Sequence, residues 1–423
     1  MDTVKALVQQ RPDFFACRPA DLTSAVRIND YIYMSYGMSN AYMVLTDAGR
    51  VIINCGLGFE APVHKKVFDA VCPGPTPYIL LTQGHVDHVG GVALFREPQT
   101  KLIAQKNLPA CQEDDRRRQS AHVAQASIWF KSSTSQMTAT DAQRRPVHVQ
   151  DVPTADISFD DSHVLEVGGR RFEMYSTPGG ETVDSCVIWL PEDRICFSGN
   201  VFGPLFPHFP NFNTLRGDKY RWFEPYLASV RRVQALEPEI LITGHFEPIV
   251  GKELIRSCLQ RLHDAVDHIH RTTLKGLNEG KSIFALMREV QLPDELYVGQ
   301  GYGKVSWAVR TIWESYMGWF RAEATSELYP TRPRDIFADL VKLAGTDAVV
   351  AEGRAKLGRG DMEGANLLAE AALRHDTRHR AALQLGIDAH RAILERSGAT
   401  NFWETGWLKH CIEKMETTLK EIQ

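Results

Sequence analysis

The sequence predicts an α/β protein in which a helix-covered β sandwich precedes an all-helical domain. Residues 28–250 contain short apolar runs of β type that end repeatedly at Gly, Pro or polar residues. Beyond residue 252, apolar residues recur at helical spacing instead. A length of 423 residues exceeds what one hydrophobic core usually serves. We therefore expect two domains, residues 1–251 and residues 252–423.

The composition excludes some classes of function. The net charge of −4 argues against a general nucleic-acid or membrane-surface binder, because such proteins need a dense basic field. No apolar run approaches the roughly 20 residues that span a bilayer. The modest net charge favours a small or medium-sized substrate. The eight cysteines lack CxxC spacing and the N-terminus has no basic and apolar leader pattern, which favours a reduced, cytoplasmic protein.

The β-type runs of the first domain begin with YIYMSYG, AYMVLTD and RVIINCG, in residues 31–56. A helix-like stretch at 61–72 leads to a buried-strand run, YILLTQ, at 78–83. Residues 108–153 are polar and charged, which predicts a helical or mobile insertion. Strand signals return in residues 163–200 and in PEILITGHFEPIV at 238–250. We expect the strands of residues 28–250 to build one sandwich.

Helical patterns fill the rest of the chain. Residues 252–280 have apolar residues at helical spacing and stop at a glycine. The segment GKVSWAVRTIWESYMGWF at 303–320 is strongly aromatic, which is typical either of a core helix or of an association surface. Residues 336–423 predict several helices similar to helical-hairpin repeats, without a strict period.

A cluster of good metal ligands follows the strand run at 78–83. His85, Asp87 and His88 lie within four residues on one predicted loop. Imidazole and carboxylate together suit zinc, iron or manganese, whereas calcium prefers more oxygen ligands. The loop end of a strand is also where functional residues commonly lie. The sequence therefore predicts a metal site here.

The motifs QGHVDH, TPGGE, SGN and TGH, in this order, resemble the pattern of the metallo-β-lactamase superfamily over residues 28–250. TPGGE, NFNTLRGD and the aromatic segment resemble the alkylsulfatase branch and its dimerisation domain. The resemblance implies an αββα sandwich followed by an all-α dimerisation domain, and a homodimer formed through it. No segment resembles the sterol-carrier-like C-terminal domain of long-chain alkylsulfatases, so we expect a small or medium-sized substrate.

The resemblance also implies two metal positions. The ligands of the second would be Asp87, His88 and His245, and those of the first would be His85 and Glu181, with Gln83 where the family has histidine. A neutral amide oxygen is a weaker ligand than imidazole. In place of the bridging carboxylate of the family, the SGN turn has Gly199 and Asn200. We expect zinc, one or two ions per chain with one held well; iron and manganese are the alternatives.

The function implied is a metal-dependent hydrolase that cleaves an ester-type bond, such as a sulfate ester, by metal-bound hydroxide. Asp87, Arg216 and Asn200 are the expected catalytic residues. Arg216 would bind an anionic group with its planar fork or form a structural ion pair. Asn200 would hydrogen-bond water or substrate or serve as a turn residue. Two alternatives stay open: a non-haem iron oxygenase or lyase that uses Asp87, His88 and His245, and a degenerate, non-catalytic binding protein.

Overall fold

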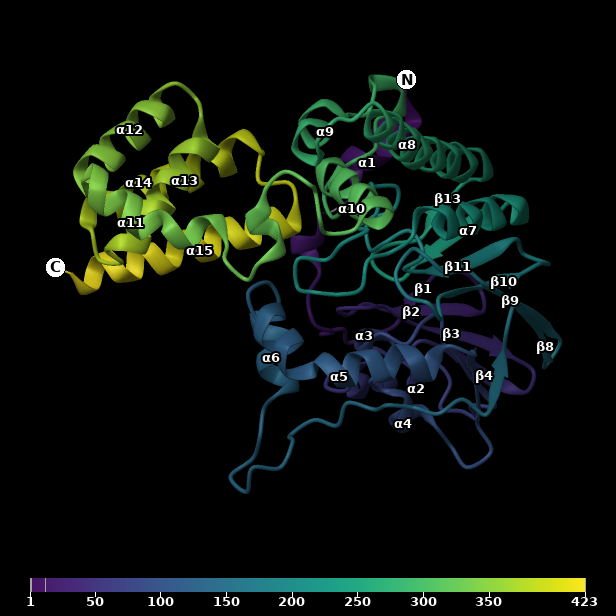
Figure 1. Cartoon of the computed structure of the whole chain (residues 1–423). Coiled ribbons are helices and arrows are strands. Elements are labelled where there is room, and N and C mark those ends of the chain that lie inside the picture. Colours follow the sequence, from purple (N-terminus) through teal and green to yellow (C-terminus); the bar gives the residue numbers. More distant parts are fainter. Residues whose placement is uncertain (1, 12, 423) are drawn as a thin grey trace. The chain divides into compact units, whose positions relative to one another are not determined.

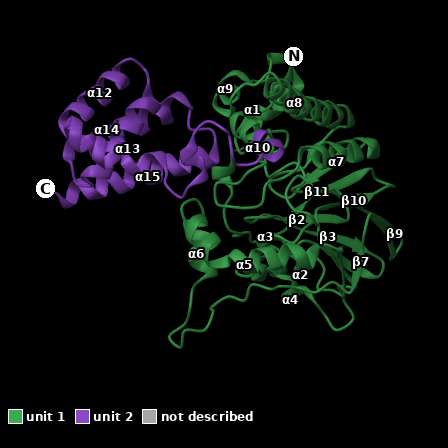
Figure 2. Ribbon diagram, in the orientation of Figure 1, with its two compact units in different colours: residues 1–312 green, residues 313–423 purple. Residues whose placement is uncertain are grey.

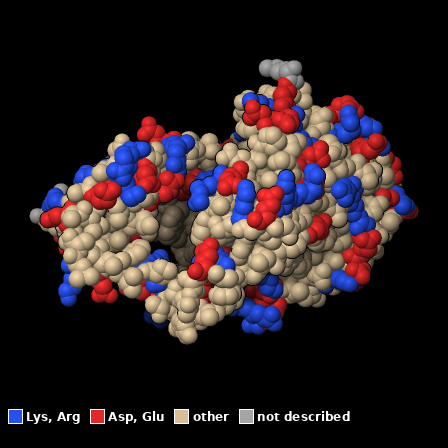
Figure 3. All heavy atoms as spheres, turned by 45° about the horizontal axis from the view of Figure 1, so that its top comes forward, with Lys and Arg blue, Asp and Glu red and all other residues tan. Residues whose placement is uncertain are grey.

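The computed structural model describes residues 2–11 and 13–422. The chain divides into two compact units, residues 1–312 and residues 313–423, which Figure 2 colours separately. The first unit contains both β-sheets and the second is entirely helical. Among the described residues, no helix is long and apolar enough to cross a membrane. On the face drawn in Figure 3, Lys and Arg side chains are interspersed with Asp and Glu.

The first sheet has seven strands whose order in space follows their order in the chain (Figure 1). The first four strands pair antiparallel, and the pairs from the fourth to the seventh are parallel. The strands are β1 (Val26–Arg27), β2 (Ile32–Ser35), β3 (Ala41–Thr46), β4 (Gly49–Ile53), β5 (Tyr78–Leu80), β6 (Lys101–Gln105) and β7 (Ile157–Phe159).

The second sheet has six strands in the order β13-β12-β11-β10-β9-β8. Only the pair of β11 and β12 is parallel. The strands are β8 (Ser162–Val167), β9 (Arg170–Ser176), β10 (Cys186–Leu190), β11 (Ile195–Gly199), β12 (Ile240–Thr243) and β13 (Ile249–Val250).

The main hydrophobic core lies between the two sheets. Apolar side chains of β2 to β6 pack there against side chains of β8 to β12, among them Val44, Ile53, Phe172 and Ile188. A second cluster on the outer face of the first sheet includes Phe68 and other side chains of the covering helices. Helices also cover the second sheet, so the layers follow the predicted αββα order (Figure 1).

The helices and short 3₁₀ helices of the first unit lie between or before the strands, or follow β13. They are α1 (Thr3–Gln10), η1 (Phe14–Ala16), α2 (Ala61–Asp69), α3 (Val86–Val89), α4 (Val92–Phe95), α5 (Leu108–Ala126), α6 (Lys131–Met137), α7 (Phe223–Leu236), α8 (Lys252–Asn278), α9 (Ile283–Glu289) and η2 (Asp294–Leu296). The predicted insertion at 108–153 is thus the β6–β7 crossover, and it begins with α5 and α6.

The division into compact units falls at 312/313, within α10 (Val305–Met317), and not at the expected domain boundary of 251/252. The reason is the amphipathic helix α8. Its buried side chains, which include Leu259 and Leu262, belong to a face that packs against α1, α7 and strands β12 and β13. A helical apolar stripe shows that a helix has a partner but does not identify that partner.

The second unit stacks its helices in sequence order. From α12 to α15 each helix contacts the one before or after it in the chain, in the pairs α12–α13, α13–α14 and α14–α15. Their core contains small side chains such as Ala365, Ala369 and Ala389. The elements are η3 (Thr325–Leu328), η4 (Pro333–Ile336), α11 (Phe337–Ala344), α12 (Thr346–Gly358), α13 (Met362–His375), α14 (Arg380–Arg396) and α15 (Phe402–Glu421). This arrangement agrees with the predicted series of helices.

Candidate metal centre

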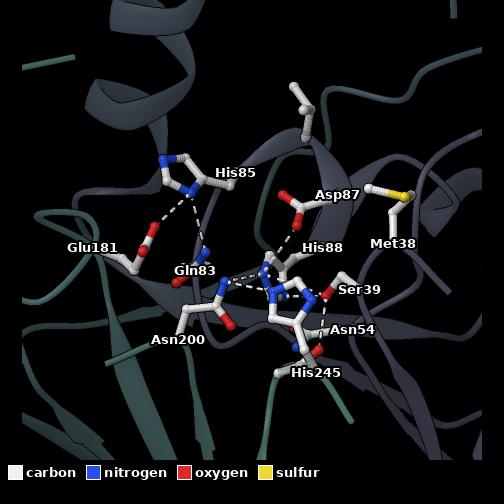
Figure 4. Close-up of polar contacts among 12 residues, drawn as sticks. Met38, Ser39, Asn54, Gln83, His85, Asp87, His88, Glu181, Asn200 and His245 are labelled. Carbon is white, nitrogen blue, oxygen red and sulfur yellow. Dashed lines mark hydrogen bonds and ion pairs between the residues drawn. The ribbon is translucent and has the colours of Figure 1, made fainter. Parts of the chain in front are cut away.

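Three strand ends bring the expected ligands to one edge of the sandwich. His85 is the N-cap residue of α3, shortly after β5; Asn200 follows β11, and His245 follows β12 (Figure 4). The second glycine of TPGGE permits a close approach here, because a Cβ on Gly180 would lie 1.9 Å from the carbonyl oxygen of Val201. The turn that carries Glu181 therefore packs directly against the turn that carries Asn200.

Asp87, His88 and His245 form one compact donor set. One ligand atom from each residue lies within 4.8 Å of the others. The Oδ2 atom of Asp87 is 3.6 Å from Nε2 of His88. Both imidazoles are buried, and Asp87 is partly exposed. The structure thus brings together the three residues that the sequence resemblance assigns to the second metal position.

The protonation states of this set suit a metal ion. Burial lowers the pKa of His88 to about 4 and also lowers the pKa of His245. Burial acts in the opposite direction on Asp87, but the neighbouring imidazoles outweigh it and lower the pKa of this carboxyl. Near neutral pH the set therefore offers two imidazole lone pairs and one carboxylate, the forms that metal binding requires.

Polar neighbours orient the two imidazoles. The hydroxyl of Ser39 lies 3.1 Å from Nδ1 of His88, and the thiol of Cys17 lies 3.9 Å from Nδ1 of His245. The Nδ2 atom of Asn200 lies 3.2 Å from Nε2 of His88 and 3.1 Å from Nε2 of His245. The Oδ1 atom of Asn200 is buried without a hydrogen-bond partner. Two oriented imidazoles and a carboxylate fit one divalent ion.

The residues expected at the first metal position make different contacts. The carboxylate of Glu181 accepts two hydrogen bonds from Arg221, at 3.1 Å to Oε1 and 3.2 Å to Oε2. Its Oε2 atom also lies 3.3 Å from Nδ1 of His85. The same nitrogen is 3.1 Å from Nε2 of Gln83, and Nε2 of His85 faces Asp218 at 3.9 Å. His85, Glu181 and Gln83 therefore meet, but as part of an ion-pair network.

The charges of this network stabilise one another. Burial alone would raise the pKa of Glu181, but the positive charge of Arg221 and the hydrogen bond from His85 lower it to about 2. Burial opposes protonation of His85, yet the hydrogen bond and charge of Glu181 raise the pKa of its imidazole. Glu181 is thus an ionised carboxylate with cationic partners from the chain itself. Sequence reasoning missed Arg221, although it lies only five residues after Arg216.

A cavity of about 490 Å³ adjoins the site. Its walls carry His85, Asp87, Glu181, Asn200, Arg216 and His245 beside apolar residues such as Phe14, Phe130, Met137 and Tyr302. The α5–α6 insertion contributes one of these walls. The cavity therefore combines an apolar wall with Asp87 and His245 of the donor set and with Arg216.

Arg216 has the environment expected of an anion-binding residue. Among the described residues, no Asp or Glu forms an ion pair with its guanidinium, and its Nε atom is buried without a hydrogen-bond partner. The guanidinium instead lies against the ring of Phe130. The alternative of a structural ion pair, which the sequence left open, does not occur within residues 2–11 and 13–422.

Comparisons with known proteins agree with this architecture. Residues 35–245 match the model of the metallo-beta-lactamase superfamily, and residues 285–407 match the model of the alkyl sulfatase dimerisation domain. A linear primary-alkylsulfatase from a Pseudomonas species is 26% identical over 88% of this chain and 73% of its own length. An alkyl/aryl-sulfatase from Saccharomyces cerevisiae is 23% identical over 92% of this chain, which spans 63% of the yeast protein.

Solved structures show the same fold. A stereoselective inverting sec-alkylsulfatase from Pseudomonas sp. superimposes with a TM-score of 0.79 at 19% identity, over 93% of this chain and 65% of that chain. A double mutant of a sec-alkylsulfatase gives a TM-score of 0.81 at 18% identity, over 98% of this chain and 67% of that chain. The similarity covers both the sandwich and the helical region.

Proposed function

The chain belongs to the metallo-β-lactamase superfamily and carries an alkylsulfatase-type dimerisation domain, and on this basis we propose that it is a metal-dependent sulfate-ester hydrolase. One observation carries the proposal. Asp87 and His245, two members of the compact donor set, line the same cavity as Arg216, whose guanidinium has no carboxylate partner among the described residues. The proposed sites for a divalent ion and for an anion thus line the same cavity.

Asp87, His88 and His245 would hold the ion, with Asn200 beside them. A divalent ion such as zinc supplies Lewis acidity and lowers the pKa of water to about 7, which is the chemistry that the proposed hydroxide attack needs. Arg216 would bind the sulfate oxygens through its planar fork. Asn200, within 3.2 Å of His88 Nε2, would hydrogen-bond the reacting water or the ester. Catalytic roles thus fall to Asp87, Arg216 and Asn200.

The cavity supports a small or medium-sized substrate with an apolar part. Phe14, Met38, Phe130 and Tyr302 would bury the organic group, while Arg216 binds the anionic end. Burial of each methylene contributes about 0.8 kcal/mol, so an apolar wall favours longer alkyl groups until the cavity is full. The substrate class that fits is a medium-sized alkyl or aryl sulfate.

We also propose that the chain forms a homodimer through its helical region. The aromatic segment at 303–320 divides by burial: Trp313 is buried, whereas Tyr316, Trp319 and Phe320 are exposed. Exposed aromatic side chains in one short segment are typical of an interface. The match of residues 285–407 to the dimerisation model supports the same assignment.

Metal analysis combined with an assay of sulfate release tests the hydrolase proposal. Wild-type protein loaded with zinc and dialysed should retain metal and release sulfate from a medium-chain alkyl sulfate. His88→Ala should lose both, because one imidazole of the donor set is gone. His163→Ala on β8 should keep both and serves as the control. Unchanged activity in His88→Ala would contradict the proposal.

The same donor set favours a second candidate. Two imidazoles and one carboxylate within 4.8 Å of one another form the ligand type of non-haem Fe(II) oxygenases. Protein purified without added metal that contains iron, consumes oxygen and releases no sulfate would support the oxygenase. Zinc content with oxygen-independent sulfate release would support the hydrolase.

A further inference from the structure

The network around Glu181 does not fit a second metal ion. Gln83 offers only a neutral amide, and each ring nitrogen of His85 faces another side chain, Nδ1 toward Glu181 at 3.3 Å and Nε2 toward Asp218 at 3.9 Å. Both oxygens of Glu181 accept hydrogen bonds from Arg221. The position between the two expected ions carries Asn200 rather than a carboxylate, so two divalent ions would repel each other with less compensation.

We propose that the guanidinium of Arg221 takes the place of the ion at the first metal position and neutralises Glu181, so that the site holds a single ion at the second position, at Asp87, His88 and His245. This inference rests on the proposed metal-dependent function. Arg221 and Glu181 side chains are each only 5% exposed. A buried carboxylate requires a cationic or hydrogen-bonding partner, and a planar fork that contacts both oxygens is a favourable one. Arg221 therefore neutralises Glu181 without a metal ion at the first position.

Arg221 also connects Glu181 to the loop that carries Arg216. The Nη1 atom of Arg221 donates a hydrogen bond to the carbonyl oxygen of Asn211 at 2.7 Å, and its backbone nitrogen donates to the carbonyl of Phe212 at 3.0 Å. Residues 211–221 are therefore closed into a loop whose end is tied to Glu181. Arg216 lies within this loop and lines the cavity. Arg221 is thus a positioning residue for Arg216.

Metal stoichiometry tests the proposal on the full chain. Zinc titration of metal-free wild type should saturate at one equivalent. Gln83→His should also stay at one, because Arg221 still holds Glu181. The double variant Gln83→His/Arg221→Met restores the imidazole and frees the carboxylate, and it should bind a second, weaker equivalent. Arg232→Met, which removes an arginine paired with Asp161 outside the site, is the matched control and should leave the stoichiometry at one.

The outcomes separate this inference from the proposed function. Two tight equivalents in wild type, or a second equivalent in Gln83→His alone, would overturn the role of Arg221 and leave the hydrolase intact. No second equivalent in a folded double variant would overturn it as well. If the double variant does not fold, a Co²⁺ titration of Gln83→His followed by absorbance still decides, with saturation at one equivalent expected. A wild type that binds no metal contradicts the proposed function itself.

Discussion

The guanidinium carbon of Arg216 lies 5.8 Å from the centre of the Phe130 ring. Arg216 belongs to the loop between β11 and α7, and Phe130 lies between α5 and α6 in the β6–β7 crossover. Two segments far apart in the sequence thus meet at the cavity. The aromatic face stabilises the cation at close range, and the charges of Asp218, Asp87 and Glu181 act on it from beyond ion-pair distance.

Replacement of Arg216 should impair substrate binding more than it impairs folding. We expect Arg216→Gln to raise KM for an alkyl sulfate by 10- to 100-fold, on the order of 1.5–3 kcal/mol, because hydrogen bonds to a charged group are lost. Arg216→Lys should recover part of the loss, since it keeps the charge but not the fork. Steady-state kinetics provide the measurement, with Arg232→Gln as control. An equal loss toward an uncharged carboxylic ester would contradict an anion-binding role.

Glu60 should make the protein less stable as the pH rises. Burial raises the pKa of this carboxyl to about 7, against the backbone N–H groups of Met38, Ala20 and Leu57 that hydrogen-bond to it. A folded pKa above the unfolded value of 4.5 means that the folded state binds the proton more tightly. The contribution of Glu60 to the unfolding free energy therefore falls between about pH 4.5 and 7, by on the order of 3 kcal/mol.

The measurement is the denaturant-induced unfolding of wild type and Glu60→Gln at pH 5 and pH 8. The variant has no proton to release, so its unfolding free energy should fall less over this interval than that of wild type. Glu253→Gln, at an exposed position, is the control, and the pH dependence of its unfolding free energy should match that of wild type. Parallel pH dependences of wild type and Glu60→Gln would show that Glu60 does not titrate in this range.

Gly91 should tolerate no side chain. A Cβ at this position would lie 2.4 Å from the carbonyl oxygen of Cys55 and 2.5 Å from the Cβ of Ala61, so the ligand-bearing loop could not pack against its neighbours. We expect Gly91→Ala to lower the unfolding free energy by about 1–3 kcal/mol. Gly358→Ala, where a Cβ meets no atom within 4 Å, is the control and should be neutral or slightly stabilising. Equal effects in thermal unfolding would contradict the packing argument.

The exposed aromatic segment should determine the oligomeric state. Trp319 is 68% exposed in the single chain. If it is buried in a dimer, Trp319→Ser should cost about 2 kcal/mol or more, a weakening of roughly 30-fold in the dimer Kd. Sedimentation velocity at micromolar concentration measures this. Trp222→Ser, an exposed tryptophan outside the residues that match the dimerisation model, should leave the dimer unchanged. A monomeric wild type would contradict the dimer.

Much of the architecture could be predicted from the sequence because it depends on local patterns. Short β-type runs and helical spacing predicted a helix-covered β sandwich and the helical region that follows it, and the resemblance to the metallo-β-lactamase superfamily implied the αββα order. The same resemblance assigned Asp87, His88 and His245 to one metal position, and ligand atoms of these three residues lie within 4.8 Å of one another. The extent of the first compact unit could not be predicted in the same way. The sequence pattern of α8 shows that the helix has an apolar face but not which element this face packs against.

What the sequence by itself determined is the set of donors and the strand ends that carry them. The tertiary structure alone decided how these donors are used. Glu181 and Arg221 are 40 residues apart, and no local pattern connects them, yet burial brings them into a two-point ion pair. Arg216 is also an arginine and lies on the same loop as Arg221, but its guanidinium packs against the ring of Phe130. Long-range packing decides which buried charge finds a partner: it pairs Arg221 with Glu181 and places Arg216 against Phe130, with no carboxylate at ion-pair distance among the described residues.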